Sequence, residues 1–291
     1  MRHFRPKQRF GEAAAGAVLV TGASSGIGRA LALDLASRGV TVFAAVRTAG
    51  DAPVESGRVH EILLDVTDAA QIVEAADTIR RTLGPERLRA LVNNAGIAVG
   101  GPLEYVPIDD VRRQFEVNVF GQLAVTQAVL ELIRAHGDGR VLFMGSIGGR
   151  VAAPFVGPYA ASKHALKGMA EAMRRELRPW NVQVCVLTAG AVATPIWHKA
   201  GQAARDLTDR LPTLAMQRYD RPMDGMRRYI AAAAAGRAIP PAPVVRAARH
   251  ALYARRARVT YLIGAEARIG VALSAALPAR VFDALLARQM R

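Results

Sequence analysis

The sequence predicts an α/β fold: a doubly wound, mainly parallel sheet of seven strands with helices on both faces. Apolar runs typical of buried strands alternate with helix-compatible segments at regular intervals, which indicates a parallel sheet. In addition, the first apolar run leads directly into a glycine-rich turn and then an amphipathic helix, the order found at dinucleotide-binding sites. A chain of 291 residues is long enough for one large domain of this kind or for two small ones.

Strands are predicted wherever a short run rich in Val, Leu and Ile stands between glycine or polar residues. They cover residues 17–20, 40–46, 59–64, 90–92, 140–145, 182–187 and 259–263. Helices are expected over residues 29–38, 68–83, 108–135 and 240–256, and through Tyr159 and Lys163 to about residue 178. Residues 195–240 lose this regular alternation. The C-terminal tail carries an apolar helical stripe flanked by arginines.

Composition argues against several classes of protein. The net charge is +15, but only four of the 39 basic residues are lysine and the arginines are scattered over many segments, so we expect no nucleic-acid partner. The single cysteine, Cys185, lies in an apolar run and is expected in the core. No run approaches the roughly 18 apolar residues of a membrane span. The basic arm, residues 1–15, and the apolar stretch that follows superficially resemble the start of a signal peptide. Because that apolar stretch is needed as a strand, we interpret the chain as cytoplasmic.

The turn after the first strand reads T-G-A-S-S-G-I-G, from Thr21 to Gly28. Its glycines let the backbone turn tightly and approach a pyrophosphate, whose charge the N-terminus of the following helix favours. The second strand ends at Arg47, near the place where NAD-binding folds carry an acidic residue. A guanidinium there, with Ser24 or Ser25 nearby, suits the 2′-phosphate of NADP. We therefore predict NADP(H) as the preferred cofactor and NAD(H) as the alternative.

A hydroxyl, a phenol and an amine stand in the segment from Ser146 to Lys163. Ser146 follows an apolar strand, whereas Tyr159 and Lys163 are four residues apart and share one face of a helix. A phenol has a pKa of about 10 and exchanges protons poorly at neutral pH unless a cation favours its ionised form. Lys163 can supply that cation, while Ser146 can hydrogen-bond a substrate oxygen. This arrangement suits carbonyl reduction or alcohol oxidation.

Two further polar sites interrupt apolar sequence. The fourth strand runs into N-N-A-G, Asn93 to Gly96, whose asparagines can satisfy both the sheet backbone and a ligand. Asn118 lies within F-E-V-N-V-F-G, on an otherwise apolar helix surface. If this asparagine is buried, its amide must bond another group.

Together these residues resemble the short-chain dehydrogenase/reductase family, which has a Rossmann-type fold. The resemblance covers roughly residues 16–265, and T-G-x-x-x-G-I-G, N-N-A-G, the asparagine, the serine and Y-x-x-x-K occur in family order at family-like distances. V-F-A-A-V-R, G-P-L-E, S-I-G-G-R-V-A-A-P-F and Y-L-I-G are most similar to the retinol and 17β-hydroxysteroid dehydrogenase-like branch. One departure is Ala189-Gly190, where the family commonly has Pro-Gly, and the missing proline loosens that turn.

The resemblance implies a role for each matching residue. Tyr159 would be the general acid/base, and Lys163 would lower its pKa and hold the nicotinamide ribose. Ser146 would orient the substrate carbonyl, and Asn118 would hold a water in the proton relay. The implied cofactor-binding residues, from pyrophosphate and 2′-phosphate through adenine and ribose to carboxamide, are Gly22, Ser24, Ser25, Gly26, Ile27, Gly28, Arg47, Asp65, Val66, Asn93, Ala95, Gly96, Tyr159, Lys163, Gly190, Val192 and Thr194. Among them, Asn93 is expected at the adenosine-side ribose.

The resemblance further implies a single catalytic domain over residues 16–291, with residues 195–240 as the substrate lid and residues 265–291 as an amphipathic tail. The apolar lid indicates a bulky apolar alcohol or carbonyl substrate, of the steroid, retinoid or fatty-carbonyl kind. A homodimer or homotetramer is expected through the long helices around Asn118 and Tyr159. The tail could pack on its own subunit, on a partner or peripherally on a membrane.

Two alternative functions stay open at this point. A 3-oxoacyl-thioester reductase would use the same chemistry, and a basic entrance would suit an acidic carrier protein. A non-catalytic NADP-sensing regulator would keep the fold without needing the proton-transfer residues, all of which are present. We predict no metal site.

Overall fold

The sheet has seven strands in the order β3-β2-β1-β4-β5-β6-β7, and each neighbouring pair runs parallel. The computed structural model describes residues 16–54, 57–84, 86–135 and 137–289. The predicted basic arm, residues 1–15, and the last two residues of the predicted tail lie outside these ranges. The predicted doubly wound α/β fold is confirmed, with a sheet that is parallel throughout.

The elements occur in the predicted order, and their ends differ from the prediction by a few residues. The strands are β1 Ala17–Thr21, β2 Val42–Val46, β3 Val59–Leu63, β4 Leu88–Asn93, β5 Arg140–Ser146, β6 Gln183–Ala189 and β7 Thr260–Ile263. The helices around the sheet are α1 Gly26–Ala36, α2 Ala69–Leu83, α3 Ile108–Phe115, α4 Gly121–Arg134, α5 Gly157–Glu176 and α8 Ala242–Tyr253. The remaining α-helices are α6 Ile196–Thr208, α7 Thr213–Ala232, α9 Ala265–Ala276 and α10 Ala279–Gln289.

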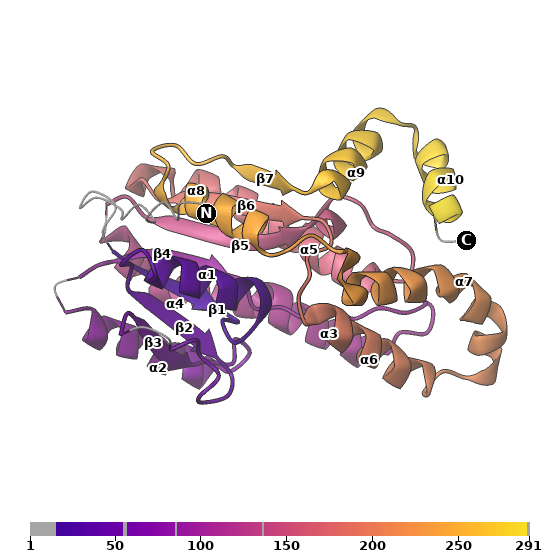
Figure 1. Ribbon diagram of the computed structural model, residues 1–291, viewed down its shortest axis with the longest axis horizontal. Helices are drawn as coiled ribbons and strands as arrows, with labels where there is room; N and C mark the ends of the chain where they lie inside the picture. Colours follow the sequence, from indigo (N-terminus) through magenta and orange to yellow (C-terminus); the bar gives the residue numbers. More distant parts are fainter. Residues whose placement is uncertain (1–15, 55–56, 85, 136, 290–291) are drawn as a thin grey trace, which may run out of the picture.

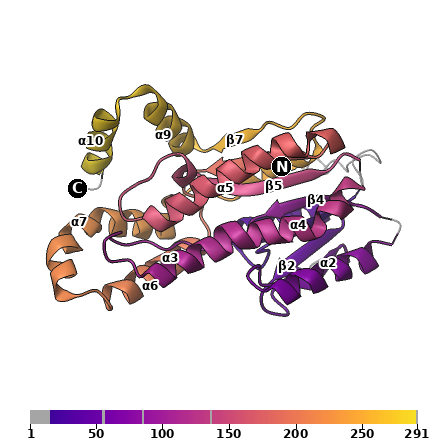
Figure 2. The same ribbon diagram turned by 180° about the vertical axis from the view of Figure 1, so that it is seen from behind.

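Helices cover both faces of the sheet because successive strand residues point to opposite sides. In β1, Val18 and Val20 pack in the layer that contains α1 and α8. Ala17 and Leu19 pack in the other layer, which contains residues of α2, α4 and α5. Figure 1 shows α1 and α8 in front of the sheet, and Figure 2 shows α2, α4 and α5 on the opposite face.

The order of the strands reverses at β1. From β1 the chain passes to β2 and β3 on one side, then returns to β4 on the other. In open α/β sheets, ligands bind in the crevice that this reversal creates at the carboxyl ends of the strands. The glycine turn follows β1 and the N-N-A-G segment begins at the end of β4, so both lie at this crevice.

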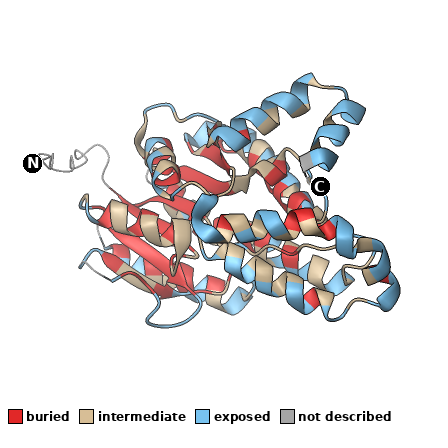
Figure 3. Cartoon of the chain, turned by 45° about the vertical axis from the view of Figure 1, so that its right-hand side comes forward, coloured by how far each residue is buried: buried red, intermediate tan, exposed pale blue. Residues whose placement is uncertain are grey.

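Two helical pairs extend beyond the sheet layers. α6 and α7 pack against each other, and together they cover residues 196–232 of the predicted lid. The tail forms two helices: α9 packs against β7 and the short 3-10 turn η3 Ile147–Gly149, and α10 packs on α9 (Figure 1). Much of both tail helices is exposed (Figure 3). Among the described residues, we find no helix with the length and apolar character needed to cross a membrane.

Candidate active site

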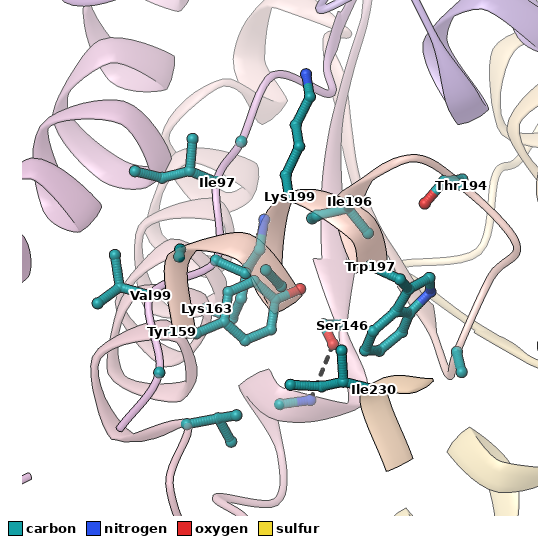
Figure 4. A pocket seen from close by; sticks show the side chains of 18 of the residues that line it. Ile97, Val99, Ser146, Tyr159, Lys163, Thr194, Ile196, Trp197, Lys199 and Ile230 are labelled. Carbon is teal, nitrogen blue, oxygen red and sulfur yellow. Dashed lines mark hydrogen bonds between the residues drawn. The ribbon is translucent and has the colours of Figure 1, made fainter. Parts of the chain in front are cut away.

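A cavity of about 1570 Å³ lies at the carboxyl ends of the strands. Its walls include the glycine turn after β1 and the ends of β2 and β3, and also residues of α6, α7, α9 and α10. Ser146, Tyr159 and Lys163 line the same cavity, as Figure 4 shows. Because small-ligand sites typically measure about 300–1,000 Å³, the volume has room for a dinucleotide and a second molecule.

The turn between β1 and α1 follows a path that requires glycine. Gly22 and Gly26 have φ angles of 64° and 57°, in the left-handed region. A Cβ atom on Gly28 would collide with the carbonyl oxygen of Gly22, so this glycine allows the helix to pack closely on the turn. Ser24, Gly26 and Ile27 line the cavity at the start of α1. The first N–H groups of a helix have no partner within the helix, so those at this helix start could bind a pyrophosphate.

Asn94 and Thr21 join this turn to the end of β4. The Thr21 hydroxyl accepts hydrogen bonds from the N–H groups of Asn94 and Ala95, at 2.9 and 3.0 Å. In return, the Asn94 amide donates to the carbonyl oxygens of Thr21 and Gly22, at 2.9 and 3.1 Å. Asn94 thus fixes the glycine turn and also lines the cavity.

Asn93 ends β4, and its side chain is directed into the protein interior. Its side chain is fully buried, and its Nδ2 donates to the hydroxyl of Thr126 on α4 at 2.8 Å. Adjacent strand residues point to opposite faces, which is why Asn94 lines the cavity and Asn93 does not. The Asn93 side chain joins β4 to α4. The expected contact of Asn93 with the adenosine-side ribose stays a prediction, and it would have to be made by the Asn93 backbone.

Ser146 ends β5, and Tyr159 and Lys163 share one face of α5. The Lys163 Nζ lies 5.8 Å from the centre of the Tyr159 ring and donates to the carbonyl oxygen of Met144 at 2.8 Å. The Ser146 hydroxyl accepts from the N–H of Gly148 at 3.1 Å and hydrogen-bonds the Tyr159 hydroxyl. The strand end and the helix thus bring together the three groups that the sequence separates by up to seventeen residues.

Burial shifts both titrating groups of this cluster towards their neutral forms. It raises the pKa of Tyr159, and the hydrogen bond with Ser146 offsets part of that rise. It lowers the pKa of Lys163 from 10.5 to about 8. At neutral pH the tyrosine is therefore a proton donor beside an amine that is still mostly protonated.

Because the pKa of Lys163 is lowered, we expect the difference in stability between wild type and Lys163→Met to depend on pH. Below pH 8 both the folded and the unfolded chain carry the charge and the full cost of burying it is present, whereas above 10.5 neither chain carries it. Between these values the unfolded chain binds more protons, so the cost falls as the pH rises. Lys163→Met has no such charge. We therefore expect the free energy of unfolding of wild type to rise, relative to that of Lys163→Met, by up to about 3 kcal/mol from pH 7 to 10.5.

Urea unfolding of both apo proteins at several pH values measures this difference. Comparing the two proteins removes contributions they share, such as the buried Cys185 thiol, whose pKa burial raises to about 11. A difference that does not change with pH would contradict the lowered pKa of Lys163.

Asn118 lies in a π-helical turn, η2 Glu116–Phe120, which interrupts the predicted continuous helix over residues 108–135. Its side chain is fully buried. The Oδ1 atom accepts from the N–H of Ile97 at 2.9 Å, and Nδ2 donates to the carbonyl oxygen of Ile97 at 3.0 Å and to the Ser162 hydroxyl at 3.2 Å. The amide thus joins α5 to the segment after β4. A Cβ on Gly96 would lie within 4 Å of both Asn118 and Lys163, so the two side chains flank this glycine.

Arg47 and Asp65 line the cavity where β2 and β3 end. Arg47 is exposed, and Ser24 and Ser25 line the same cavity, as a site for a 2′-phosphate requires. Burial acts to raise the pKa of Asp65, but hydrogen bonds from Thr67 and the charge of Arg47 outweigh it and the net shift is downward. Asp65 therefore stays ionised, with its Oδ1 accepting from the N–H and the hydroxyl of Thr67 at 2.9 and 2.8 Å.

The loop after β6 is held in place without the usual proline. The N–H of Ala193 donates to the carbonyl oxygen of Ile239 at 2.8 Å, and the N–H of Ile239 donates to that of Ala191 at 3.1 Å. Gly190, Val192 and Thr194 of this loop line the cavity. Strand-like pairing with residue 239 therefore restrains the segment that Ala189-Gly190 was expected to loosen.

The structure brings nearly all predicted site residues to one cavity; Gly28, Asn93 and Asn118 support it from behind. Sequence reasoning did not assign Asn94, although the asparagine doublet signalled it, and did not assign Glu266. Glu266 lines the cavity from the first turn of α9. An acidic residue at a helix start is commonly explained by the helix dipole, so nothing in the sequence pattern indicates that Glu266 lines a cavity.

The fold and the site define a nucleotide-binding α/β oxidoreductase. The sequence model of the family described as short chain dehydrogenase matches residues 16–205. The chain therefore belongs to the short-chain dehydrogenase/reductase family, an enzyme family acting on alcohol and carbonyl groups, as its motifs predicted.

Relatives and solved structures agree with this assignment. An NADPH-dependent 3-dehydrocapnine reductase from Ornithobacterium rhinotracheale is 31% identical over 94% of this chain and 96% of its own length. Mouse retinol dehydrogenase 5 is 33% identical over 92% of this chain and 87% of its own, which confirms the expected likeness to the retinol dehydrogenase branch. A crystal structure of a short chain dehydrogenase from Burkholderia cenocepacia in complex with NADP is 27% identical, with a TM-score of 0.71 and coverage of 96% of this chain and 99% of that one.

Proposed function

We propose that this enzyme is an NADP(H)-dependent oxidoreductase that interconverts an alcohol and a ketone or aldehyde on a bulky apolar substrate. The observation that carries the proposal is the meeting of Ser146, Tyr159 and Lys163 in one cavity, in contact with the glycine turn at one end and with apolar helices at the other. NAD(H) is the alternative cofactor. The same site supports the alternative of a 3-oxoacyl-thioester reductase.

The residues around the glycine turn fit a dinucleotide. Side chains are missing where a pyrophosphate must approach, since Gly22 and Gly26 adopt left-handed φ angles and Gly28 has no room for a Cβ. When bound, the nicotinamide supplies or accepts the hydride. Arg47, with Ser24 and Ser25, would hold a 2′-phosphate, and Val192 and Thr194 would hold the carboxamide. The known relatives that support NADP are the NADPH-dependent reductase and the NADP complex described above.

During carbonyl reduction, the Tyr159 hydroxyl gives its proton to the carbonyl oxygen of the substrate. The Ser146 hydroxyl hydrogen-bonds the same oxygen and orients it. Lys163 favours the phenolate that remains, because a cation near a phenol stabilises its ionised form. Asn118 would hold a water that returns a proton to the site, as the family resemblance implies. Alcohol oxidation uses the same groups in reverse.

The outer half of the cavity supports an apolar substrate. Its lining includes Ile196, Trp197, Met223, Met226, Ile230, Ile269, Leu273, Phe282, Leu285 and Leu286. Burying such surface against a ligand contributes about 25 cal/mol per Å² of apolar area. Because the wall extends as far as α10, a substrate with a long or large apolar body would make more of these contacts than a compact one.

Turnover with NADPH or NADH against steroid ketones, retinal, long-chain aldehydes and oxoacyl thioesters tests the proposal. We expect turnover of one apolar class with NADPH as the better cofactor. Activity confined to thioesters would favour the alternative reductase. Tight NADPH binding without turnover of any carbonyl compound would favour the non-catalytic sensor.

Replacing Leu286 on α10 with aspartate tests the apolar wall. Leu286→Asp should raise KM for the apolar substrate by about tenfold, because a charge would replace apolar contact area, and should leave KM for a short carbonyl compound unchanged. Ala284→Asp is the matched control, because Ala284 is on the same helix and does not line the cavity. Equal effects of the two variants on KM would contradict a role of α10 in binding the substrate.

We further propose that residues 16–291 form a single catalytic domain with residues 195–240 as the lid, and that the protein is cytoplasmic. A homodimer or homotetramer would form through the helices around Asn118 and Tyr159, where Phe120 is 53% exposed. Val281 and Leu285 are exposed on α10, which supports a further contact of the tail with a partner or a membrane surface.

A further inference from the structure

We infer that Glu266 is a positioning residue that ties the lid helix α7 to the loop after β6, so that one carboxylate sets both halves of the cavity. Its Oε1 accepts a hydrogen bond from the Tyr229 hydroxyl at 2.6 Å, and its Oε2 accepts one from the N–H of Ala191 at 2.8 Å. Tyr229 belongs to α7, and Ala191 belongs to the loop after β6. The inference rests on the proposed function, in which α7 lies against the substrate and this loop holds the nicotinamide.

The backbone is shaped to let Glu266 approach the loop. A Cβ on Gly190 would lie only 2.7 Å from the Glu266 Oε2 atom, so any larger residue at position 190 would displace the carboxylate from its present place. Glu266 also lies in the first turn of α9, where the helix dipole favours a negative charge. Hydrogen bonds to an ionised oxygen are shorter and stronger than neutral ones, in keeping with both distances. Burial and Glu266 raise the pKa of Tyr229, which keeps its hydroxyl protonated and donating.

A second connection joins helix α7 to the loop after β6. The rings of Trp197 and Tyr229 meet edge to face, with centroids 5.6 Å apart and an interplanar angle of 79°. The Trp197 Nε1 donates to the carbonyl oxygen of Val192 at 2.8 Å. Contacts therefore run in a closed ring from Glu266 to Tyr229, Trp197, Val192 and Ala191, and back to Glu266. A displacement of α7 would break the ring on both sides.

This ring couples the binding of the substrate to the binding of the cofactor. Tyr229 is 37% exposed, and Tyr229, Trp197 and Glu266 all line the cavity, so water reaches their contacts while the cavity is open. An apolar substrate that fills the cavity excludes this water and strengthens the hydrogen bonds, because they then lie in a medium of lower polarity. The loop after β6 is thereby held more firmly, which raises the affinity for the cofactor. By linkage, a bound cofactor raises the affinity for the substrate by the same factor.

The test uses three variants of the full chain and one matched control. Tyr229→Phe removes the hydroxyl on the lid, Glu266→Ala removes both bonds, and Glu266→Gln keeps an oxygen for Ala191 and an N–H group for Tyr229. The control is Tyr219→Phe, because Tyr219 is also on α7 and donates to Glu104 at 2.7 Å, yet does not line the cavity. The measurements are NADPH affinity by fluorescence, hydrogen exchange of residues 189–195 and 213–232, and KM and kcat for the best substrate of the panel.

We expect Glu266→Ala to weaken NADPH binding about tenfold and to speed exchange in both segments, since it loses two hydrogen bonds to a charged group. Tyr229→Phe should speed exchange in residues 213–232 and raise substrate KM about fivefold with little change in kcat. Glu266→Gln should recover most of the NADPH affinity. Effects of Tyr229→Phe no larger than those of Tyr219→Phe, or a Glu266→Gln variant as impaired as Glu266→Ala, would overturn the inference.

The exchange and affinity measurements need no turnover, so the failure of the proposed function can be told apart from the failure of the ring. If no carbonyl compound reacts but both segments lose protection in Glu266→Ala, the positioning role stands and the substrate assignment fails. If turnover is found and exchange in both segments is unchanged, the oxidoreductase stands and the role of Glu266 is refuted.

Discussion

Replacing Tyr159 with phenylalanine is expected to lower kcat/KM for the apolar carbonyl substrate by about 10³-fold, the loss typical of removing a general acid. The substitution deletes only the hydroxyl, so the ring still packs on α5 and the cavity keeps its shape. NADPH affinity should therefore stay within about twofold of wild type, because the glycine turn and Arg47 are untouched. Steady-state kinetics and fluorescence titration of the same preparation measure both quantities.

Tyr219→Phe provides the control for this variant, because it removes a tyrosine hydroxyl outside the cavity. It should retain wild-type kinetics. If Tyr159→Phe retained more than a tenth of the activity, a different proton donor would have to be sought. If it lost NADPH binding as well, the kinetic loss would not report proton transfer.

Replacing Arg47 with aspartate should reverse the cofactor preference. The ratio of kcat/KM with NADPH to kcat/KM with NADH should fall roughly 100-fold, because a charged hydrogen bond to the 2′-phosphate is lost and a repulsive charge is gained. The same carboxylate can accept a hydrogen bond from the ribose 2′-hydroxyl of NADH. The ratio is measured at fixed ionic strength, since exposed charges are screened by salt.

Arg58→Asp is the matched charge reversal for this experiment. Arg58 is exposed, precedes β3 at the amino end of the strands, and does not line the cavity. It changes the net charge by the same amount, so any general electrostatic effect on the anionic cofactor will appear in both variants. A ratio that moves equally in Arg47→Asp and Arg58→Asp would remove Arg47 from the 2′-phosphate site.

Much of the fold could be predicted because buried parallel strands are apolar on both faces and therefore stand out as continuous runs. The prediction was less accurate where a strand carries a buried charge. β4 begins at Leu88, two residues earlier than expected, and so includes the buried Arg89, which donates to the carbonyl oxygen of Leu252 and pairs with Asp138. An arginine in a sequence indicates an exposed residue, and its distant partners cannot be read from the local pattern.

The π-helical turn and the role of Glu266 also depend on distant partners that the local sequence pattern does not reveal. The predicted helix over residues 108–135 shows no interruption in sequence, but a Cβ on Gly121 would lie 2.5 Å from the carbonyl oxygen of Val66, so the helix path depends on close packing against a distant loop. Glu266 meets Ala191 because β7 pairs with β6 in a register that sets Ile263 beside Ala189. Motif spacing predicts the residues that share a helix or a strand end, whereas such contacts depend on the assembled sheet.

The tail helices contribute to the cavity wall while α10 packs chiefly on α9, away from the sheet. Substitutions on α10 can therefore accumulate without disturbing the two cores that stabilise the fold or the cluster around Tyr159. Natural variation or directed selection confined to residues 279–289 could redirect such an enzyme from one apolar compound to another at little cost in folding stability. If α10 binds the substrate as proposed, we expect its sequence to change the substrate range at less cost in stability than changes in the sheet layers.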